Sequence, residues 1–218
     1  MQSLKLEKAL RNKGKKESEA VSLSGPATLR NAELSFLIDE YSDLEVHVRG
    51  LIRDLCRPFC GKCEKPCCRE KICRETLDSL WLRMVWESKR LDINSYDESN
   101  GWLTVNGCAL ETGRTPLCYE FFCSKIMSSF AGEYQRYGVN VLGDLISFVG
   151  RDAFSKRHLV TLSDPEELLC MNYGKIYERI LKAHDALDDC IYLIRNDSAS
   201  DGILRDLQPI QRVPRGLS

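Results

Sequence analysis

Apolar residues recur at spacings of three and four near the start of the chain and predict a long helix over residues 31–55. Together they form one apolar stripe along this helix, made of Leu34, Ile38, Tyr41, Leu44, Val48, Leu51, Ile52 and Leu55. We expect the helix to end before Pro58, because proline has no amide hydrogen and its ring collides with the preceding turn.

A second apolar stripe lies near the other end of the chain and predicts a long helix over residues 165–195. Its positions step alternately by four and three, the spacing of a heptad seam: Leu169, Tyr173, Ile176, Ile180, Ala183, Leu187, Cys190 and Ile194. A capping residue, a first-turn proline and two acids predict its start, in the segment Ser163-Asp164-Pro165-Glu166-Glu167. We expect the seam to pack along the helix at 31–55, and the sequence leaves open whether a second copy of the chain fills it.

Shorter patterns between the two long helices predict further elements. Helices are expected over residues 74–90, 117–130 and 138–157, with Gly138 and Gly150 as punctuation of the last. An extended stretch at 102–105 is expected to form a small hairpin with 108–110, because asparagine–glycine pairs supply turn signals on either side.

The fold class predicted from these patterns is mainly α. The long N- and C-terminal helices pack together, and an irregular cysteine-rich metal-binding lobe at 56–125 lies between them. Residues 31–197 form a single helical domain on this interpretation. A flexible basic arm at 1–30 precedes the domain, and an irregular tail at 198–218 follows it.

The amino-acid composition is that of an ordinary globular protein and argues against nucleic acids and membranes as partners. The chain has 218 residues, 43% of them hydrophobic and 29% charged, with a formal net charge of −1. A charge this small provides no overall field to attract nucleic acid or an anionic membrane. No apolar stretch approaches the roughly 18 residues of a membrane helix, and no apolar segment follows the basic N-terminal residues as in a secretory signal. We therefore expect a cytoplasmic protein that binds neither membranes nor nucleic acids.

Cysteine is the residue type that departs from this ordinary composition. The chain has 11 cysteines, of which six lie between positions 56 and 73 and three follow at 108, 118 and 123. Cytoplasmic thiols are kept reduced, whereas disulfide frameworks belong mainly to exported proteins. We therefore expect the clustered cysteines to hold a metal rather than to pair as disulfides. Cys170 and Cys190 lie outside the cluster and are expected to pack in the core.

Spacing within the cluster indicates thiolate ligands. Cys60 and Cys63 are two residues apart, with Gly61 between them, and a turn of that length directs both sulfurs toward one ion. The adjacent Cys67 and Cys68 follow. Thiolates are the ligands that zinc and iron–sulfur clusters prefer, so the sequence allows either zinc or iron.

This two-part arrangement resembles the YkgJ-type cysteine-cluster family, which is described as a zinc- or iron-chelating domain. The resemblance covers residues 56–125 and is carried by Cys60, Cys63, Cys67, Cys68, Cys108, Arg114, Pro116 and Cys118. It implies that the six cysteines of this set are metal ligands. Pro66 and Thr115 are additional residues relative to the usual pattern. Cys56, Cys73 and Cys123 are left open as ligands or bystanders.

Two classes of function follow from the cluster. In the first, zinc or iron is held by thiolates from two distant segments and stabilises the fold, while the helix at 165–195 binds a protein partner or a second copy. The alternative is an enzyme that uses an iron–sulfur centre for redox or SAM-dependent chemistry. Cys56, Cys60 and Cys63 match the spacing of a radical SAM cluster, but a helix rather than a barrel strand is expected before them. No glycine loop, carboxylate pair or dinucleotide fingerprint indicates a substrate.

Two further side chains carry weaker signals. Arg114 is expected to hydrogen-bond a carboxylate or a cluster sulfur, and a substrate anion is the alternative. His184 and Asp188 have a helical metal-ligand spacing, but we expect an ordinary solvated or hydrogen-bonded pair.

Overall fold

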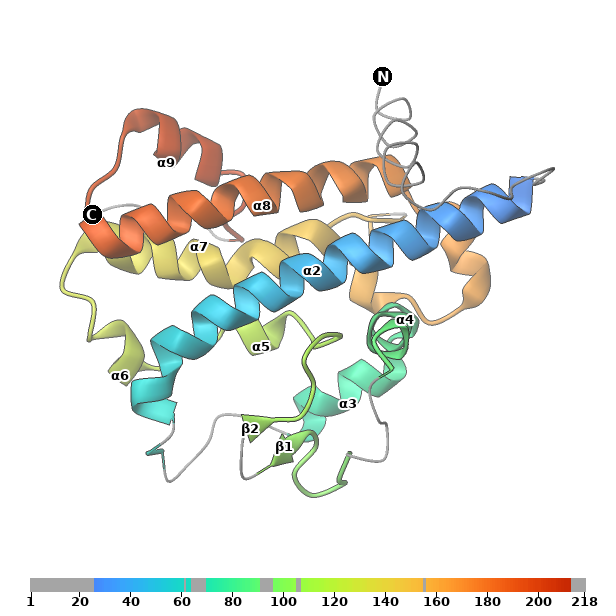
Figure 1. Ribbon diagram of the computed structural model, residues 1–218, viewed down its shortest axis with the longest axis horizontal. Coiled ribbons are helices and arrows are strands. Elements are labelled where there is room, and N and C mark those ends of the chain that lie inside the picture. Colours follow the sequence, from blue (N-terminus) through green and yellow to red (C-terminus); the bar gives the residue numbers. More distant parts are fainter. Residues whose placement is uncertain are drawn as a thin grey trace, which may run out of the picture.

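The computed structural model describes residues 26–60, 62–63, 70–90, 96–104, 107–154 and 156–212, with side chains from residue 30 onward. These residues are mainly helical, as the sequence predicts, and include one small two-stranded sheet. The long helices α2, Pro26–Cys60, and α8, Tyr173–Asn196, pack together and against α7, Glu133–Gly150. The hairpin and α3, Glu70–Asp78, lie on the side of α2 away from α8 (Figure 1). Residues 1–25 of the expected arm lie outside the described residues.

The N-terminal helix forms because its apolar stripe is covered on several sides. Leu37, Leu44 and Val48 are completely buried, among contacts of α2 with α4, α7 and α8. The expected end before Pro58 is wrong, since α2 continues through this proline to Cys60. Pro58 lies in the last turn, so the one hydrogen bond that it removes and the distortion caused by its ring affect only the end of α2.

The C-terminal seam is filled within the chain. Its central residues are buried against α7 and α2, namely Ile176, Ile180, Ala183, Leu187 and Cys190. The predicted start at residue 165 is wrong by eight residues, about two helical turns. The cap at Asp164 begins a separate 3-10 helix, Pro165–Cys170, and α8 starts only after Asn172, whose side chain accepts a hydrogen bond from the Lys175 amide at 3.0 Å.

Because one continuous helix was predicted over 165–195, the predicted burial of two residues is wrong. Leu169 is 64% exposed rather than part of the seam, and Cys170 is exposed rather than buried in the core. Met171 turns into the core between the two helical segments instead. Cys190 is completely buried, as predicted.

Helix α7 lies between α8 and the short helix α5, Leu117–Glu120. It begins five residues earlier than predicted, so Gly138 is internal rather than a boundary. A Cβ at Gly138 would lie 3.0 Å from Cβ of Leu193, and one at Gly143 would lie 2.8 Å from the carbonyl oxygen of Tyr119. These glycines therefore let α8 and α5 approach the backbone of α7. The helix ends at Gly150, one of the two glycines expected to punctuate it, and so seven residues before the predicted end at 157.

The segment expected to be one helix over 74–90 is divided into α3 and α4, Leu80–Ser88. Ser79 separates them, and its hydroxyl accepts a hydrogen bond from the Leu82 amide at 3.2 Å. The Leu80 amide donates to the carbonyl of Leu162 at 2.7 Å, outside the helix. This break turns α4 so that Trp81 enters the main core.

The remaining short elements agree with the sequence prediction only in part. The predicted helix at 117–130 is two helices, α5 and α6, Ser124–Met127. The hairpin is present, with β1, Leu103–Thr104, antiparallel to β2, Gly107–Cys108. The tail contains helix α9, Asp201–Leu207, because Ser200 caps it and Leu207 is buried. Among the described residues, no helix combines the length and apolar character that crossing a bilayer requires.

Candidate metal centre

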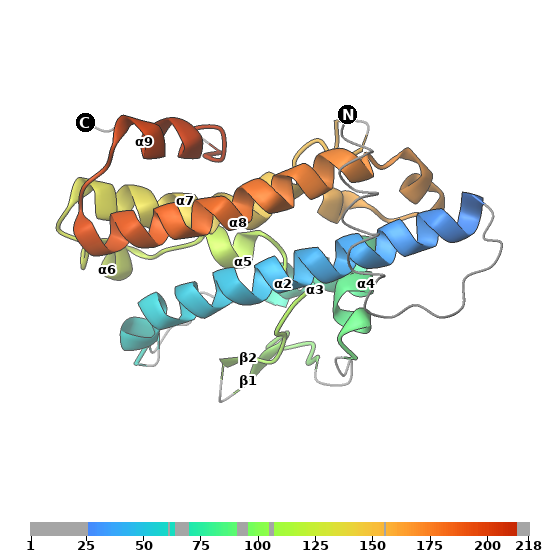
Figure 2. The ribbon, with the colours of Figure 1, turned by 45° about the horizontal axis from the view of Figure 1, so that its top comes forward.

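Four of the six predicted ligands lie in the described part of the chain. Cys60 is the last residue of α2, Cys63 follows it, Cys108 is in β2 and Cys118 is in α5. In both views, the end of α2 and the hairpin lie on the side of the molecule away from α9 (Figures 1 and 2). Cys60, Cys63 and Cys118 are exposed and Cys108 is half-buried. Cys67 and Cys68 lie outside the described residues.

The described side chains do not by themselves complete a metal site. Within the ranges given above, no three histidine, cysteine, aspartate or glutamate residues are grouped so that they could hold a metal ion. The expected set draws two of its six thiolates from the segment between Cys63 and Glu70, which is not described. The structure therefore gives the support around the predicted site rather than its coordination.

That support centres on Glu45, a carboxylate of α2 that is completely buried. Its Oε2 accepts a hydrogen bond from the Gly113 amide at 2.7 Å. Its Oε1 accepts from the Arg114 amide at 2.8 Å and from the Tyr119 hydroxyl at 2.6 Å. Burial raises the pKa of Glu45, and the hydrogen bonds from Tyr119, Arg114 and Gly113 oppose that shift. Glu45 thus fixes the segment between Cys108 and Cys118 to the long helix.

The turn at Gly113 is what brings the Arg114 backbone to Glu45. Gly113 has a φ of +75°, and a Cβ there would lie 2.8 Å from the carbonyl oxygen of Leu82. A side chain at this position would therefore meet both a strained backbone conformation and the backbone of α4.

The Arg114 guanidinium turns back toward the hairpin. Its Nε donates to the carbonyl of Leu110 at 2.8 Å, and its Nη2 donates to Leu110 at 2.5 Å and to Cys108 at 3.4 Å. Burial alone would lower the pKa of Arg114, but the nearby acidic groups Tyr119, Cys108, Cys118 and Glu45, which are negative when ionised, outweigh burial and raise it. A permanent cation therefore lies within electrostatic reach of two predicted ligands.

A second link ties the same segment to α3. The Thr115 hydroxyl donates to the Glu75 carboxylate, and Thr115 is 1% exposed. Pro116 then occupies the N-terminal cap of α5, and the Cys118 amide donates to the Thr115 carbonyl at 2.9 Å. The additional residue Thr115 thus connects the downstream half of the cluster to the helix that follows the upstream half.

Of the three cysteines left open as ligands, Cys73 lies in an apolar cluster. Cys73 is 8% exposed and packs with Trp86, Trp102 and Leu110. Burial raises the pKa of the Cys73 thiol, and a hydrogen bond from the Trp102 backbone opposes that shift. Packing explains Cys73 without a metal.

Cys56 and Cys123 lie nearer the predicted ligands. Because α2 continues to Cys60, Cys56 is four residues from it on the same helix and shares its face. Cys123 is the N-terminal cap of α6, which lies beside the C-terminal end of α2 (Figure 1). Both positions border the predicted site.

The helical placement of Cys56 and Cys60 also bears on the radical SAM alternative. The three-cysteine loop of that class follows a barrel strand, whereas Cys56 and Cys60 belong to a helix here. The sheet formed by the described residues has two short strands. These residues therefore do not form the expected setting for such a loop.

His184 does not form a metal site with Asp188 among the described groups. Its ring packs edge-on against His47, with ring centroids 5.9 Å apart. Burial lowers the pKa of His184, and the neighbouring His47 lowers it further. Asp188 and both histidines line an open groove of about 660 Å³ between α2 and α8.

Sequence patterns missed the buried polar groups that organise the site. Glu45 lies between Tyr41 and Val48 on the apolar face of α2, so a charged residue inside an apolar stripe was the available signal. Tyr119 gave no signal of its own, because its partner is 74 residues away.

Comparison of the chain with protein-family models, curated proteins and solved structures found no significant match.

Proposed function

We propose that this protein binds zinc or an iron centre through thiolates from two segments, Cys60 to Cys68 and Cys108 to Cys118, as the resemblance to the YkgJ-type cysteine-cluster family implies. The observation that carries the proposal is the position of the half-buried Arg114, which lies between Cys108 and Cys118 and whose guanidinium donates to the Cys108 carbonyl at 3.4 Å. A guanidinium beside sulfur ligands can donate hydrogen bonds to them and offset their negative charge. No catalytic residue is assigned in this proposal.

The anchored backbone around Arg114 supports the same conclusion. Glu45 and Glu75 hold positions 113 to 115 to two different helices, so the downstream pair of cysteines is carried on a fixed support. Such support is typical of the residues that surround metal ligands. Ligands drawn from segments 40 residues apart in sequence would make metal binding a source of folding free energy.

The proposal is tested by purifying the full chain without oxygen and measuring its metal content and visible absorption. Stoichiometric zinc without colour would indicate a zinc site, and a brown protein with bound iron would indicate an iron–sulfur centre. Cys108→Ser and Cys118→Ser are each expected to lower the metal content. Cys170→Ser, at an exposed cysteine of the 3-10 helix, is the matched control and should retain it. A folded, colourless chain without metal would refute the proposal.

A further inference from the structure

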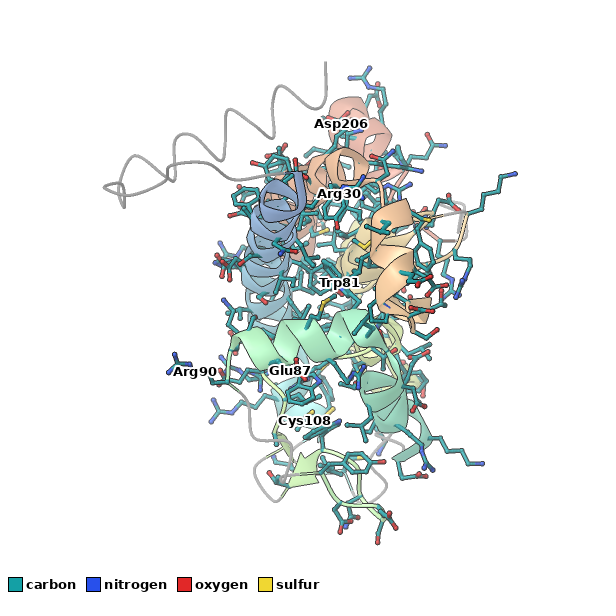
Figure 3. The ribbon with its side chains drawn as sticks, turned by 90° about the vertical axis from the view of Figure 1, so that its right-hand side faces the viewer. Arg30, Trp81, Glu87, Arg90, Cys108 and Asp206 are labelled. Atoms are coloured by element: carbon teal, nitrogen blue, oxygen red, sulfur yellow. The ribbon has the colours of Figure 1, made fainter. Side chains whose placement is uncertain are left out.

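A second polar site lies far from the cysteines, between α7, α8 and α9. A pocket of about 610 Å³ opens there, within the size range of small-molecule sites. Figure 3 shows Asp206, which lines this pocket, at the opposite end of the molecule from Cys108, with Trp81 between them. The pocket therefore belongs to neither the hairpin nor the predicted metal centre.

Two arginines meet on one aromatic ring in the wall of this pocket. The guanidinium carbon of Arg179 lies 5.4 Å from the centroid of the Phe148 ring, and that of Arg151 lies 5.8 Å from the same centroid. Arg151 donates to the carbonyls of Ile210 at 2.9 Å and Pro209 at 3.5 Å. Its charge is thus held in place by the turn after α9.

Arg179 is the unusual member of the pair. Its Nη1 is buried and has no hydrogen-bond partner among the described residues. No carboxylate of those residues is within ion-pair distance of Arg179 or Arg151. Burial lowers the pKa of Arg179, the charges of Asp152 and Glu178 partly oppose this, and Arg151 lowers it further. Two neighbouring guanidiniums without a carboxylate at ion-pair distance would be stabilised by a bound anion.

The rest of the pocket limits what that anion can be. Lys175, Lys182 and Arg205 add positive charge to the lining. Four carboxylates also line the pocket, those of Glu178, Asp185, Asp189 and Asp206, and Glu178 pairs with Lys182 at 3.3 Å. Burial raises the pKa of Asp189, and the nearby Asp206, Asp188 and Asp185 raise it further. These carboxylates would repel a long polyanion, so the pocket favours a compact anion whose charge is confined to one group.

We propose that Arg179 and Arg151 form a binding site for the phosphate group of a small phosphomonoester. The dianion balances the two guanidiniums, and each guanidinium presents paired donors that match phosphate oxygens. The accessible guanidinium donors of Arg179 and Arg151 bind these oxygens, and Phe148 packs against both side chains. This site is independent of the proposed metal centre.

The first measurement is calorimetric titration of the full chain with inorganic phosphate and with glycerol phosphate, at ionic strength held constant with chloride. Both ligands are expected to bind and to raise the midpoint of thermal unfolding. Sedimentation with vesicles that contain phosphatidic acid distinguishes a lipid phosphate from a soluble one, and we expect no sedimentation. Phosphate that binds no better than chloride would overturn the proposal.

The matched variants are Arg179→Met and Arg195→Met, both on α8. Arg179→Met removes the guanidinium but keeps an apolar side chain over Phe148, so folding should be preserved or improved while phosphate binds at least about tenfold more weakly. Arg195, exposed near the end of α8, should tolerate its change without effect on binding. Should Arg179→Met fail to fold, Arg179→Lys keeps the charge without the planar donor pair and is expected to weaken binding. Unchanged affinity in the folded Arg179 variant would place the anion elsewhere and refute the assignment.

Discussion

Replacing Glu45 by glutamine tests whether this buried carboxylate anchors the cysteine-bearing segment. The amide has nearly the same shape, but one of its two ends becomes a donor. If its oxygen takes the place of Oε1, the bonds from the Arg114 amide and the Tyr119 hydroxyl at 2.8 and 2.6 Å are retained. The new NH2 group then faces the Gly113 amide, which donates to Oε2 at 2.7 Å in the native chain.

The expected loss follows from these contacts. A hydrogen bond to a charged group contributes about 1.5–3 kcal/mol, and the opposed donors add a smaller penalty. Relief from burying a full charge offsets part of this, since burial raises the pKa of Glu45. We expect Glu45→Gln to lower the free energy of unfolding by about 2 kcal/mol. Glu45→Ala leaves three donors without a partner and should cost about 3–5 kcal/mol, as for removal of one member of a buried ionic pair.

Urea unfolding followed by circular dichroism measures this difference, with the metal content of each protein determined beforehand. For a urea dependence of about 2 kcal/mol per molar, Glu45→Gln should lower the midpoint by about 1 M. Tyr119→Phe and the double variant complete a cycle in which the two losses should be less than additive. Asp54→Asn, at an exposed carboxylate of the same helix, is the control and should leave the midpoint unchanged. Equal midpoints for Glu45→Gln and the native chain would refute the anchoring role.

Two further predictions concern stability. Gly143→Ala should destabilise the protein by about 1–3 kcal/mol through overpacking, because its Cβ would lie 2.8 Å from the Tyr119 carbonyl oxygen; Gly50→Ala, with nothing within 4 Å, should instead stabilise it by about 0.5–1 kcal/mol. Matching urea midpoints for the two variants would contradict this packing argument. His158 holds the loop after α7, since its Nε2 pairs with the Ser147 carbonyl at 3.0 Å and its Nδ1 accepts from the Val160 amide at 3.2 Å. Burial lowers the pKa of His158 below 6.5, so its contribution is fully present above that value and is lost as the pH falls through the pKa of the folded state. The urea midpoint should decline below about pH 6.5, less steeply in His158→Gln, and an equal slope in both proteins would exclude His158 as the cause.

The long helices could be predicted because their information is local. The apolar residues from Leu34 to Leu55 follow the helical period, and those of the seam from Ile176 to Cys190 do the same. The boundaries could not be predicted as well, because capping residues compete. Asp164 and Asn172 are both good caps, and only the tertiary packing of Met171 between them decides where α8 begins.

Of the candidate site, the cysteine segments could be predicted from the sequence, and the residues that support them could not. The cysteine segments were evident because clustered thiols are rare in a composition of this kind, and the short hairpin that carries Cys108 followed from turn signals. Their support was not evident, because Glu45 meets its partners across 68 to 74 residues of sequence. No local pattern records such a contact. Arg114 was expected to bond a carboxylate, but it is the Arg114 backbone amide that does so.

The positions of the three tryptophans allow intrinsic fluorescence to report on the cysteine-rich lobe. Trp81 belongs to the main helical core, whereas Trp86 and Trp102 pack together over Cys73, with ring centroids 6.5 Å apart. Two of the three indoles therefore emit from the lobe, while the circular dichroism signal arises mostly from the long helices. Comparing the two signals during unfolding distinguishes a lobe that opens separately from one that unfolds with the bundle. If the protein binds a metal as proposed, a metal chelator should first change the emission of Trp86 and Trp102, which can be measured at low protein concentration.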